Sequence, residues 1–170
     1  MVEADCIRSK GLLKYKCKCH LHLSVSVQKS LETMQKLNFD LSIYTFDIDA
    51  AGHVGNNVYL QWVEMGRCKF LEAVNFPIHT AMASGVAPVI ANMNIAYKKP
   101  LYLGEKVLLE MWLSELKKVT HTLEFRFYNG AGLLVATGQQ RGVFVNSATL
   151  KPTALAPNIR ELFLPYIQAQ

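Results

Sequence analysis

The sequence predicts an α+β fold, with a five-stranded antiparallel sheet wrapped around one long helix. The first indication is a helical repeat of apolar residues between residues 59 and 74. The second is a set of five strand-like segments, one before this helix and four after it. Short turns join the last four segments, which makes antiparallel neighbours of them. Since the strand-helix-strand order does not repeat along the chain, a parallel α/β arrangement is not favoured.

A polar loop separates the first strand from the long helix. Apolar and polar residues alternate over residues 38–46, as in a half-buried strand. The apolar face of the helix consists of Tyr59, Trp62, Val63, Gly66, Phe70, Ala73 and Val74. Asn56 or Asn57 can cap the first helical turn by accepting a backbone N–H bond. Gly66 costs about 1 kcal/mol of helix propensity relative to Ala, so we expect the helix to lie very close to the sheet there.

The rest of the chain predicts four strands and a short helix. The strands are expected at residues 87–97, 106–116, 120–128 and 133–146, after a connection over residues 75–86. Asn129-Gly130 predicts a hairpin turn, and Gly138 and Gly142 are expected bend or bulge sites in the last strand. Apolar residues beyond Pro157 indicate a short amphipathic helix that packs on the domain, namely Ile159, Leu162, Phe163 and Tyr166.

The length and charge of the chain limit its class. We expect the 170 residues to form one domain over residues 36–170, preceded by a flexible basic tail over residues 1–35. Residues 1–36 carry +4 of the net charge of +5, so the charge gives no indication of a nucleic-acid partner. No apolar run reaches the ~18–20 residues of a membrane helix, and no secretory signal pattern is present. A cytoplasmic protein without a membrane span is therefore expected.

Three of the four cysteines lie in the basic tail, close to two histidines. These residues are Cys6, Cys17, Cys19, His20 and His22. A zinc site is conceivable, but structural zinc usually takes C-x2–4-C spacing, so the C-x-C spacing favours a loosely ordered tail without metal. Cys68 lies on the long helix and is expected to be an ordinary thiol. Because no disulfide framework is evident, a reducing compartment fits best.

The loop and the start of the helix carry a family pattern. From Asp47 to Glu64 the chain reads D-x-D-x-x-G-H-V-x-N-x-x-Y-L-x-W-x-E. This resembles the signature of hotdog-fold acyl-CoA thioesterases of the 4-hydroxybenzoyl-CoA thioesterase-like family, over about residues 38–147. Family members often read G-H-V-N-N, whereas Gly55 replaces the first of these asparagines here. The resemblance implies a hotdog fold, no cofactor, and sites between subunits, so a homodimer or homotetramer is expected.

Thioester hydrolysis needs a group that activates water or attacks the carbonyl, and a group that polarises the carbonyl oxygen. A carboxylate can do the first, and the free N–H groups of a helix N-terminus can do the second. Asp49 stands just ahead of the helix, and Gly55 and Asn56 open it. The resemblance implies that Asp49 is the catalytic base or nucleophile and that the Asn56 amide polarises the carbonyl. From the residues alone, Asp49 could equally cap a turn, and Asp47 is expected to be structural.

Further residues are candidates for the same site. Glu64 on the helix is an alternative base, although it could instead make a helix or subunit contact. His53 could orient a carboxylate or touch the substrate, and Tyr59 is expected at the substrate. The phosphates of coenzyme A call for basic groups. Two lysine pairs could supply them, to an acyl-CoA or to an acidic acyl carrier protein, namely Lys117/Lys118 and Lys98/Lys99.

Two other functions remain open from the sequence. A hotdog protein could bind acyl-CoA without hydrolysing it, and an intact Asp49 argues against this. A hotdog dehydratase would need a histidine on or near a strand together with a carboxylate on the helix. His121 is the one histidine within a predicted strand. A serine-hydrolase triad is not favoured, because no serine stands in a G-x-S-x-G setting.

Overall fold

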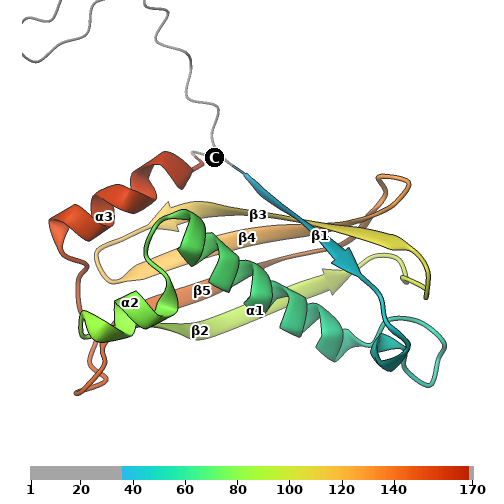
Figure 1. Cartoon of the computed structure of the whole chain (residues 1–170), viewed down its shortest axis with the longest axis horizontal. Helices are drawn as coiled ribbons and strands as arrows, with labels where there is room; N and C mark the ends of the chain where they lie inside the picture. Colours follow the sequence, from blue (N-terminus) through green and yellow to red (C-terminus); the bar gives the residue numbers. More distant parts are fainter. Residues whose placement is uncertain (1–35, 169–170) are drawn as a thin grey trace, which may run out of the picture. The chain divides into compact units, whose positions relative to one another are not determined.

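The computed structural model describes residues 36–168, which form one five-stranded sheet with helices packed against it (Figure 1). The strands are β1 (Leu37–Ser42), β2 (Val86–Tyr97), β3 (Lys106–Leu116), β4 (Thr120–Asn129) and β5 (Leu134–Asn146). The helices are α1 (Asn56–Ala73), α2 (Ile78–Ala83) and α3 (Pro157–Phe163), with 3-10 helices at Thr45–Asp47 and Leu164–Tyr166. The sheet order is β1-β3-β4-β5-β2, and every neighbouring pair is antiparallel. The predicted sheet with one long helix is confirmed.

Helix α1 crosses one face of the sheet, which we call the inner face (Figure 1). At Gly66, a β-carbon would lie 2.8 Å from Cδ2 of Leu109 and 3.0 Å from Cε of Met111, both on β3. These distances are shorter than normal contacts of a β-carbon, so only glycine at this position allows α1 to pack this close to β3. The close approach predicted at Gly66 is therefore confirmed.

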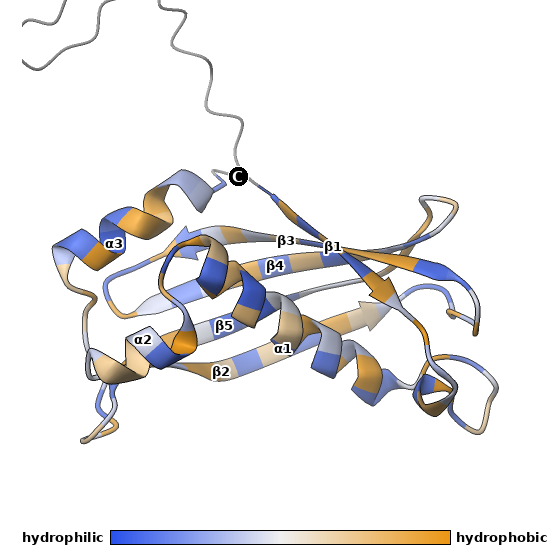
Figure 2. Cartoon of the chain, viewed as in Figure 1, coloured by the Kyte–Doolittle hydropathy of each residue, from blue (hydrophilic) through white to orange (hydrophobic). Residues whose placement is uncertain are grey.

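Successive residues of the strands alternate between the core and the outer face of the sheet, and hydrophobic and hydrophilic colours alternate along the strand ribbons (Figure 2). On β4 the buried residues Leu123, Phe125 and Phe127 face α1. Arg126 lies between them in sequence and is exposed on the other face. Because the period is two, the same alternation that predicted these strands also fixes which face each residue takes.

Two segments differ from the prediction. The strand expected over residues 38–46 ends at Ser42, and a 3-10 turn follows at Thr45–Asp47. The Oδ2 atom of Asp47 accepts a hydrogen bond from the Tyr44 amide at 2.8 Å, which stabilises the turn over a continuing strand. The connection expected over residues 75–86 contains the short helix α2, which reverses the chain into β2.

The glycines of β5 permit close packing against neighbouring residues. Strand β5 stays in register with β4 at both Gly138 and Gly142. The pairing of β2 with β5 shifts between Ile90 and Asn92, next to Gly142, and the pairing of β4 with β5 shifts between Phe127 and Tyr128. A side chain at Gly142 would collide with the imidazole of His121. The β2–β5 register thus shifts beside Gly142 but not at Gly138, so an irregularity is found at one of the two predicted positions, and the missing side chain at Gly142 also makes room for the His121 ring.

The C-terminal segment packs on the domain as predicted. Phe163 of α3 is buried, and the Tyr166 hydroxyl donates a hydrogen bond to the Ala73 carbonyl at 2.8 Å. Arg160 donates to the carbonyls of Leu116 and Lys117, at the turn after β3. Within residues 36–168, no helix is both long and apolar enough to cross a membrane. The tail expected over residues 1–35, with its cysteines and histidines, lies outside the described residues.

Candidate active site

The loop ahead of α1 is held closed by main-chain hydrogen bonds. The Asp49 amide donates to the His53 carbonyl at 2.9 Å, and the Gly52 amide donates to the Asp49 carbonyl at 3.0 Å. Gly52 has φ of 81°, a left-handed conformation that favours glycine. Buried Asp47 contributes its carbonyl to the Gly55 amide at 2.9 Å. The loop therefore fixes the backbone on both sides of Asp49.

The Asp49 side chain lies beside the N-terminus of α1 and remains open to water. Its Oδ1 atom accepts a hydrogen bond from the Ala51 amide at 2.8 Å, and its Oδ2 atom lies 3.5 Å from Nδ1 of His53. The side chain is 39% exposed. At Gly55, the N-cap of α1, a β-carbon would lie 3.6 Å from Cβ of Asp49. A carboxylate thus stands directly against the helix end.

The first turn of α1 has no side-chain cap. Gly55 occupies the N-cap position, so the cap predicted at Asn56 or Asn57 is wrong. The Gly55 amide is already bonded to Asp47, whereas the amides of Asn56 and Asn57 donate to no acceptor within residues 36–168. Free amides at a helix N-terminus carry roughly half a positive charge between them. The helix end can therefore polarise an oxygen placed near Asn56.

A hollow of about 320 Å³ opens at this end of α1. Its walls are formed by His53, Val54, Asn56, Tyr59, Tyr97, Lys98, Lys99 and Pro100. Five of these are predicted site residues, which the fold brings together from the loop, the helix and the end of β2. The amides of Lys98 and Lys99 both donate to the Val135 carbonyl, at 2.8 and 3.1 Å, which fixes the backbone that carries the two lysines.

Tyr97 is a member of this hollow that the sequence reasoning missed. Its hydroxyl donates to the Asn56 carbonyl at 3.3 Å, and its ring meets the Tyr59 ring edge-on at 5.1 Å between centroids. Tyr59 is buried, and this burial, with smaller effects of Tyr97 and Glu105, raises its pKa to about 12. The Tyr59 hydroxyl therefore keeps its proton at neutral pH. Its place in the sequence, directly before the predicted site residues Lys98 and Lys99, was the signal that could have identified Tyr97.

Glu64 lies two turns further along α1 and is bound by Arg67. Arg67 donates to both carboxylate oxygens of Glu64, through Nη2 at 2.5 Å and through Nε at 2.9 Å. The Glu64 side chain is 44% exposed, whereas that of Arg67 is buried. The hydrogen bond to Glu64 raises the pKa of Arg67, so the guanidinium keeps its positive charge. The i, i+3 spacing of Glu64 and Arg67 on a predicted helix is a signal of such an ion pair in the sequence.

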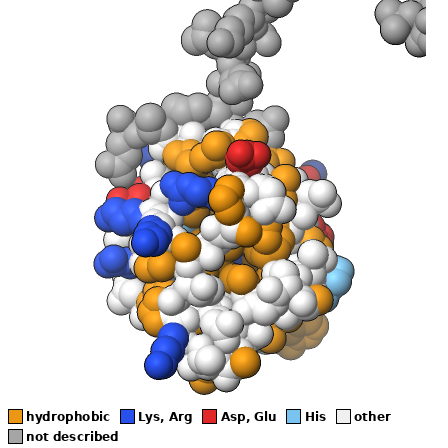
Figure 3. All heavy atoms as spheres, turned by 90° about the vertical axis from the view of Figure 1, so that its left-hand side faces the viewer, with side chains coloured by type: hydrophobic (Ala, Val, Ile, Leu, Met, Phe, Trp, Pro, Cys, Tyr) orange, Lys and Arg blue, Asp and Glu red, His pale blue; other side chains and the backbone are white. Residues whose placement is uncertain are grey.

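The second lysine pair lies elsewhere. Lys117 and Lys118 occupy the turn between β3 and β4, at the end of the sheet opposite to the N-terminus of α1 (Figure 1). Lys117 pairs with Glu115 at 2.8 Å. Figure 3 looks at that end of the molecule and shows basic side chains beside an apolar surface. Within one protomer, Lys117 and Lys118 therefore cannot share the hollow with Asn56.

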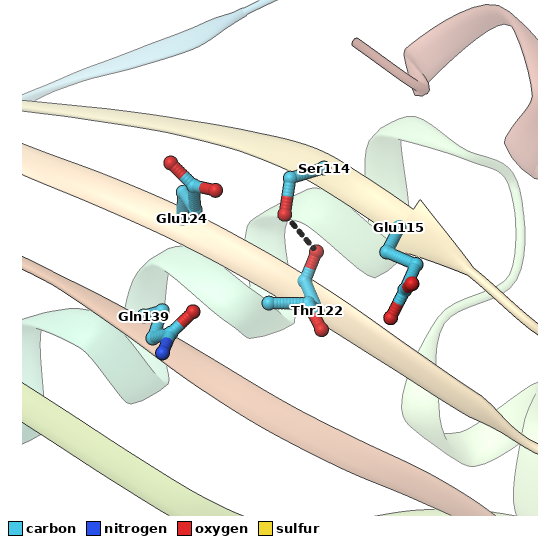
Figure 4. A pocket seen from close by; sticks show the side chains of 5 residues that line it. All are labelled: Ser114, Glu115, Thr122, Glu124 and Gln139. Atoms are coloured by element: carbon cyan, nitrogen blue, oxygen red, sulfur yellow. Dashed lines mark hydrogen bonds between the residues drawn. The ribbon is translucent and has the colours of Figure 1, made fainter. Parts of the chain in front are cut away.

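Another hollow, of about 330 Å³, lies on the outer face of the sheet and holds no predicted site residue (Figure 4). It is lined by Ser114, Glu115, Thr122, Glu124 and Gln139. In this hollow, the Ser114 hydroxyl donates a hydrogen bond to the Thr122 carbonyl at 3.3 Å (Figure 4). Among residues 36–168, no group of three or more His, Cys, Asp or Glu could hold a metal ion.

Comparisons with known proteins agree with this fold. A sequence model of the thioesterase-like superfamily matches residues 44–163. The acyl-CoA thioester hydrolase YbgC of Escherichia coli O6:H1 is 26% identical over 117 residues, covering 69% of this chain and 87% of that protein. The acyl-acyl carrier protein thioesterase ATL3 of Arabidopsis thaliana is 24% identical over 132 residues, covering 76% of this chain and 68% of that protein.

Solved structures show the same fold. The DHNA-CoA thioesterase from Staphylococcus aureus superposes with a TM-score of 0.71 at 21% identity, covering 75% of this chain and 88% of that one. The 1,4-dihydroxy-2-naphthoyl-CoA thioesterase Slr0204 from Synechocystis gives a TM-score of 0.70 at 17% identity, covering 76% and 96%. The hotdog fold expected from the sequence is therefore confirmed.

Proposed function

Because the chain belongs to the thioesterase-like superfamily, we propose that it hydrolyses the thioester of an acyl-CoA to a free acid and coenzyme A. The observation that carries the proposal is the Asp49 carboxylate, held open to water beside the uncapped N-terminus of α1. An acyl group on an acyl carrier protein presents the same thioester, and its hydrolysis is the second form of this proposal.

Asp49 acts as general base or as nucleophile. As a base, it takes a proton from the water that attacks the carbonyl carbon; the C–S bond then breaks, and the thiolate leaves and takes up the proton. As a nucleophile, the carboxylate attacks the carbonyl and expels the thiolate, and water then hydrolyses the resulting anhydride. The loop hydrogen bonds support either role, because one oxygen is anchored by Ala51 and the other faces His53.

The Asn56 amide stabilises the negative oxygen that forms in either route. It points from the helix end that carries the positive end of the dipole, and it donates to no acceptor within the described residues. A pre-positioned donor of this kind is worth ~10²–10³ in kcat in other acyl-transfer sites. The Gly55 amide is engaged by Asp47, so we assign Gly55 a different role: it leaves room for the Asn57 side chain, whose Oδ1 would lie 2.8 Å from a β-carbon at this position.

Lys98 and Lys99 are the basic groups we assign to the phosphates of coenzyme A. They line the hollow at the helix end, next to His53 and Tyr59. Lys117 and Lys118 could contribute only from another subunit. An acidic carrier protein would meet the same Lys98/Lys99 pair through charge complementarity.

The assembly we propose is a homodimer or a dimer of dimers. Strand β2 lies at the edge of the sheet, and Val89 and Ile90 on it are 40% and 42% exposed. An apolar edge strand is a ready template for pairing with another chain. Two copies that pair along β2 would remove this edge from water and bring two α1 helices side by side.

The alternatives have less support. Glu64 could serve as base only after release from Arg67, which binds both of its carboxylate oxygens. A dehydratase would require His121 at the reacting atoms, but His121 is buried against the Phe144 ring. Arg67 bonds both the helix carboxylate Glu64 and the Pro88 carbonyl of the sheet. A non-catalytic acyl-CoA-binding protein would keep the lysines without needing Asp49.

A thiol-release assay tests the proposal. The full chain is incubated with aliphatic and aromatic acyl-CoAs, and with an acyl-acyl carrier protein, and free thiol is followed over time. Release that is proportional to enzyme and abolished by heat inactivation is expected for at least one acyl-CoA. Tight binding without release from any thioester would support the non-catalytic alternative. Release from the carrier protein alone would favour the second form.

A further inference from the structure

Leu150 adopts a backbone conformation that leucine rarely takes. Its φ is 56°, in the left-handed region, where the β-carbon lies too close to the following carbonyl oxygen. Within residues 36–168, the one other non-glycine residue with a positive φ is Asn75, just beyond the end of α1. Asparagine tolerates this region better than leucine does. Glycine or asparagine would therefore suit position 150 better than the residue that occupies it.

Hydrogen bonds within the loop between β5 and α3 hold Leu150 in this conformation. The Leu150 amide donates to the Asn146 carbonyl at 2.8 Å, and the Asn146 amide donates to the Lys151 carbonyl at 2.9 Å. The Asn146 side chain accepts hydrogen bonds from the amides of Ala148 and Thr149, at 3.0 and 2.8 Å. The loop is therefore closed on itself and presents the leucine in a fixed position.

The packing of the domain does not account for a leucine at this position. The Leu150 side chain is 71% exposed and does not belong to the hydrophobic core. The residue thus contributes little to the core, and its backbone conformation is unfavourable for its type. Strained residues of this kind concentrate where a protein contacts a ligand or a partner. Leu150 therefore indicates a contact with something outside the chain.

A second exposed apolar residue, Met82 at the end of α2, is tied to this loop. The Ser147 amide donates to the Gly85 carbonyl at 2.9 Å, and the Gly85 amide donates to the Met82 carbonyl at 3.1 Å. Met82 is 48% exposed. Figure 3 looks at this end of the molecule and shows apolar side chains gathered across it, with basic side chains along one margin.

Lysines lie beside these apolar side chains. Lys151 follows Leu150 directly, and Lys118 lies in the turn between β3 and β4. The Phe144 amide donates to the Val119 carbonyl at 2.9 Å, which places this turn next to the end of β5, where the loop begins. Both lysines are exposed, and neither forms an ion pair within the described part of the chain.

The carboxylates of the same elements do not neutralise these two lysines. Glu115 is paired with Lys117 at 2.8 Å, so their charges cancel. On α3, Arg160 and Glu161 are adjacent in sequence and carry opposite charges. The two unpaired lysines therefore leave this surface positively charged around its apolar side chains.

We propose that Met82, Leu150, Lys118 and Lys151 form a docking surface for an anionic lipid membrane. The apolar side chains enter the headgroup region, and the lysines supply charge complementarity to anionic lipids. A fluid lipid layer adapts to separate apolar side chains, whereas a protein partner would need a fitted pocket for each of them. Because the surface shares no residue with the hollow at the N-terminus of α1, docking does not depend on the proposed hydrolysis.

Vesicle co-sedimentation with the full chain tests the proposal. The vesicles consist of phosphatidylcholine alone or of an equal mixture of phosphatidylcholine and phosphatidylglycerol. The protein should bind the anionic vesicles more strongly than the neutral ones, and high salt should reduce the difference. Leu150→Asn should lower the partition coefficient on anionic vesicles about fivefold or more. The double variant Lys118→Gln/Lys151→Gln should lower it about tenfold or more.

Thermal unfolding separates a contact with lipid from a role in packing. Because asparagine suits the left-handed conformation, Leu150→Asn should raise Tm by about 2–4 °C while it weakens vesicle binding. Leu133→Asn is the matched control, since Leu133 is 47% exposed in the turn between β4 and β5, at the opposite end of the sheet. It should leave vesicle binding unchanged. A lower Tm for Leu150→Asn would mean that the leucine packs in the fold, which would overturn its role as an anchor.

The binding data can also contradict the proposal directly. Equal binding to neutral and anionic vesicles, or none to either, would overturn it. Anionic binding that survives both Leu150→Asn and Lys118→Gln/Lys151→Gln would assign the attraction to other basic residues, such as those of the N-terminal tail. Binding of an acidic protein, such as an acyl carrier protein, that requires Leu150 while vesicles are not bound would assign the surface to a protein partner instead.

Discussion

The Nδ1 atom of His53 lies 3.5 Å from Oδ2 of Asp49, and both side chains are more than a third exposed. An exposed pair of this kind is worth at most about 1 kcal/mol. His53→Gln should therefore lower kcat by less than about fivefold. Steady-state kinetics with one acyl-CoA checks this. A loss of a hundredfold or more would show that His53 itself transfers a proton and that Asp49 is not the sole acid–base group.

The lysines at the hollow should dominate the affinity for coenzyme A. Charge-assisted hydrogen bonds to phosphate contribute about 1.5–3 kcal/mol each when formed, so the double variant Lys98→Ala/Lys99→Ala should raise KM about tenfold or more with little change in kcat. The dependence of KM on salt should also weaken. The matched double variant Lys117→Ala/Lys118→Ala is the control. A larger rise in KM for the control would mean that a second subunit supplies the phosphate site.

The buried His121 makes stability depend on pH in a defined window. Its pKa is about 4 in the folded protein and about 6.5 when exposed. Between pH 4 and pH 6.5, His121 is therefore protonated in the unfolded chain but neutral in the folded protein. The free energy of unfolding is unaffected above pH 6.5 and decreases as the pH drops toward 4. The loss amounts to about 3 kcal/mol. Urea unfolding from pH 7 to pH 4 should show it, and His121→Phe should remove this part of the slope. An identical slope in the variant would contradict the burial of the imidazole.

The apolar edge of β2 predicts self-association. Sedimentation at micromolar concentration should give a dimer or tetramer, and Ile90→Lys should shift the protein toward monomer by placing a charge on the edge. Turnover should fall with it if the site lies between subunits. A wild-type protein that sediments as a monomer would contradict this assembly. Leu103→Lys, an exposed position off the sheet edge, is a suitable control.

Much of the fold could be predicted because it depends on periodic patterns. The apolar repeat of α1, the alternation of β4 and Gly66 each encode a contact with the core, and each is found as expected except that Ala73 at the end of the repeat is exposed. The 3-10 turn at Asp47 and the helix α2 could not be predicted, because they depend on tertiary hydrogen bonds and on how the chain must reverse into β2.

The site divides in the same way. Asp49, His53 and Asn56 are close in sequence, so the loop pattern predicts their proximity. Tyr97 joins them across forty-one residues through one hydrogen bond. The alternation along β4 places His121 on the face of Leu123, Phe125 and Phe127, so its burial could have been predicted from the sequence. The burial of Gln140 follows from the sheet register, which pairs it with buried Leu123.

The most direct measurement is the single-turnover rate of the Asp49→Asn variant, with Asp47→Asn and Glu64→Gln beside it. The Asn replacement keeps the size of the side chain and can still accept the hydrogen bond from Ala51, but it lacks the charge that attacks or takes a proton. The rate should fall by ~10²–10⁴, with Kd for the acyl-CoA little changed, and the two other variants should lose much less. Near-full turnover in Asp49→Asn, together with its loss in Glu64→Gln, would contradict the assignment and place the base on α1.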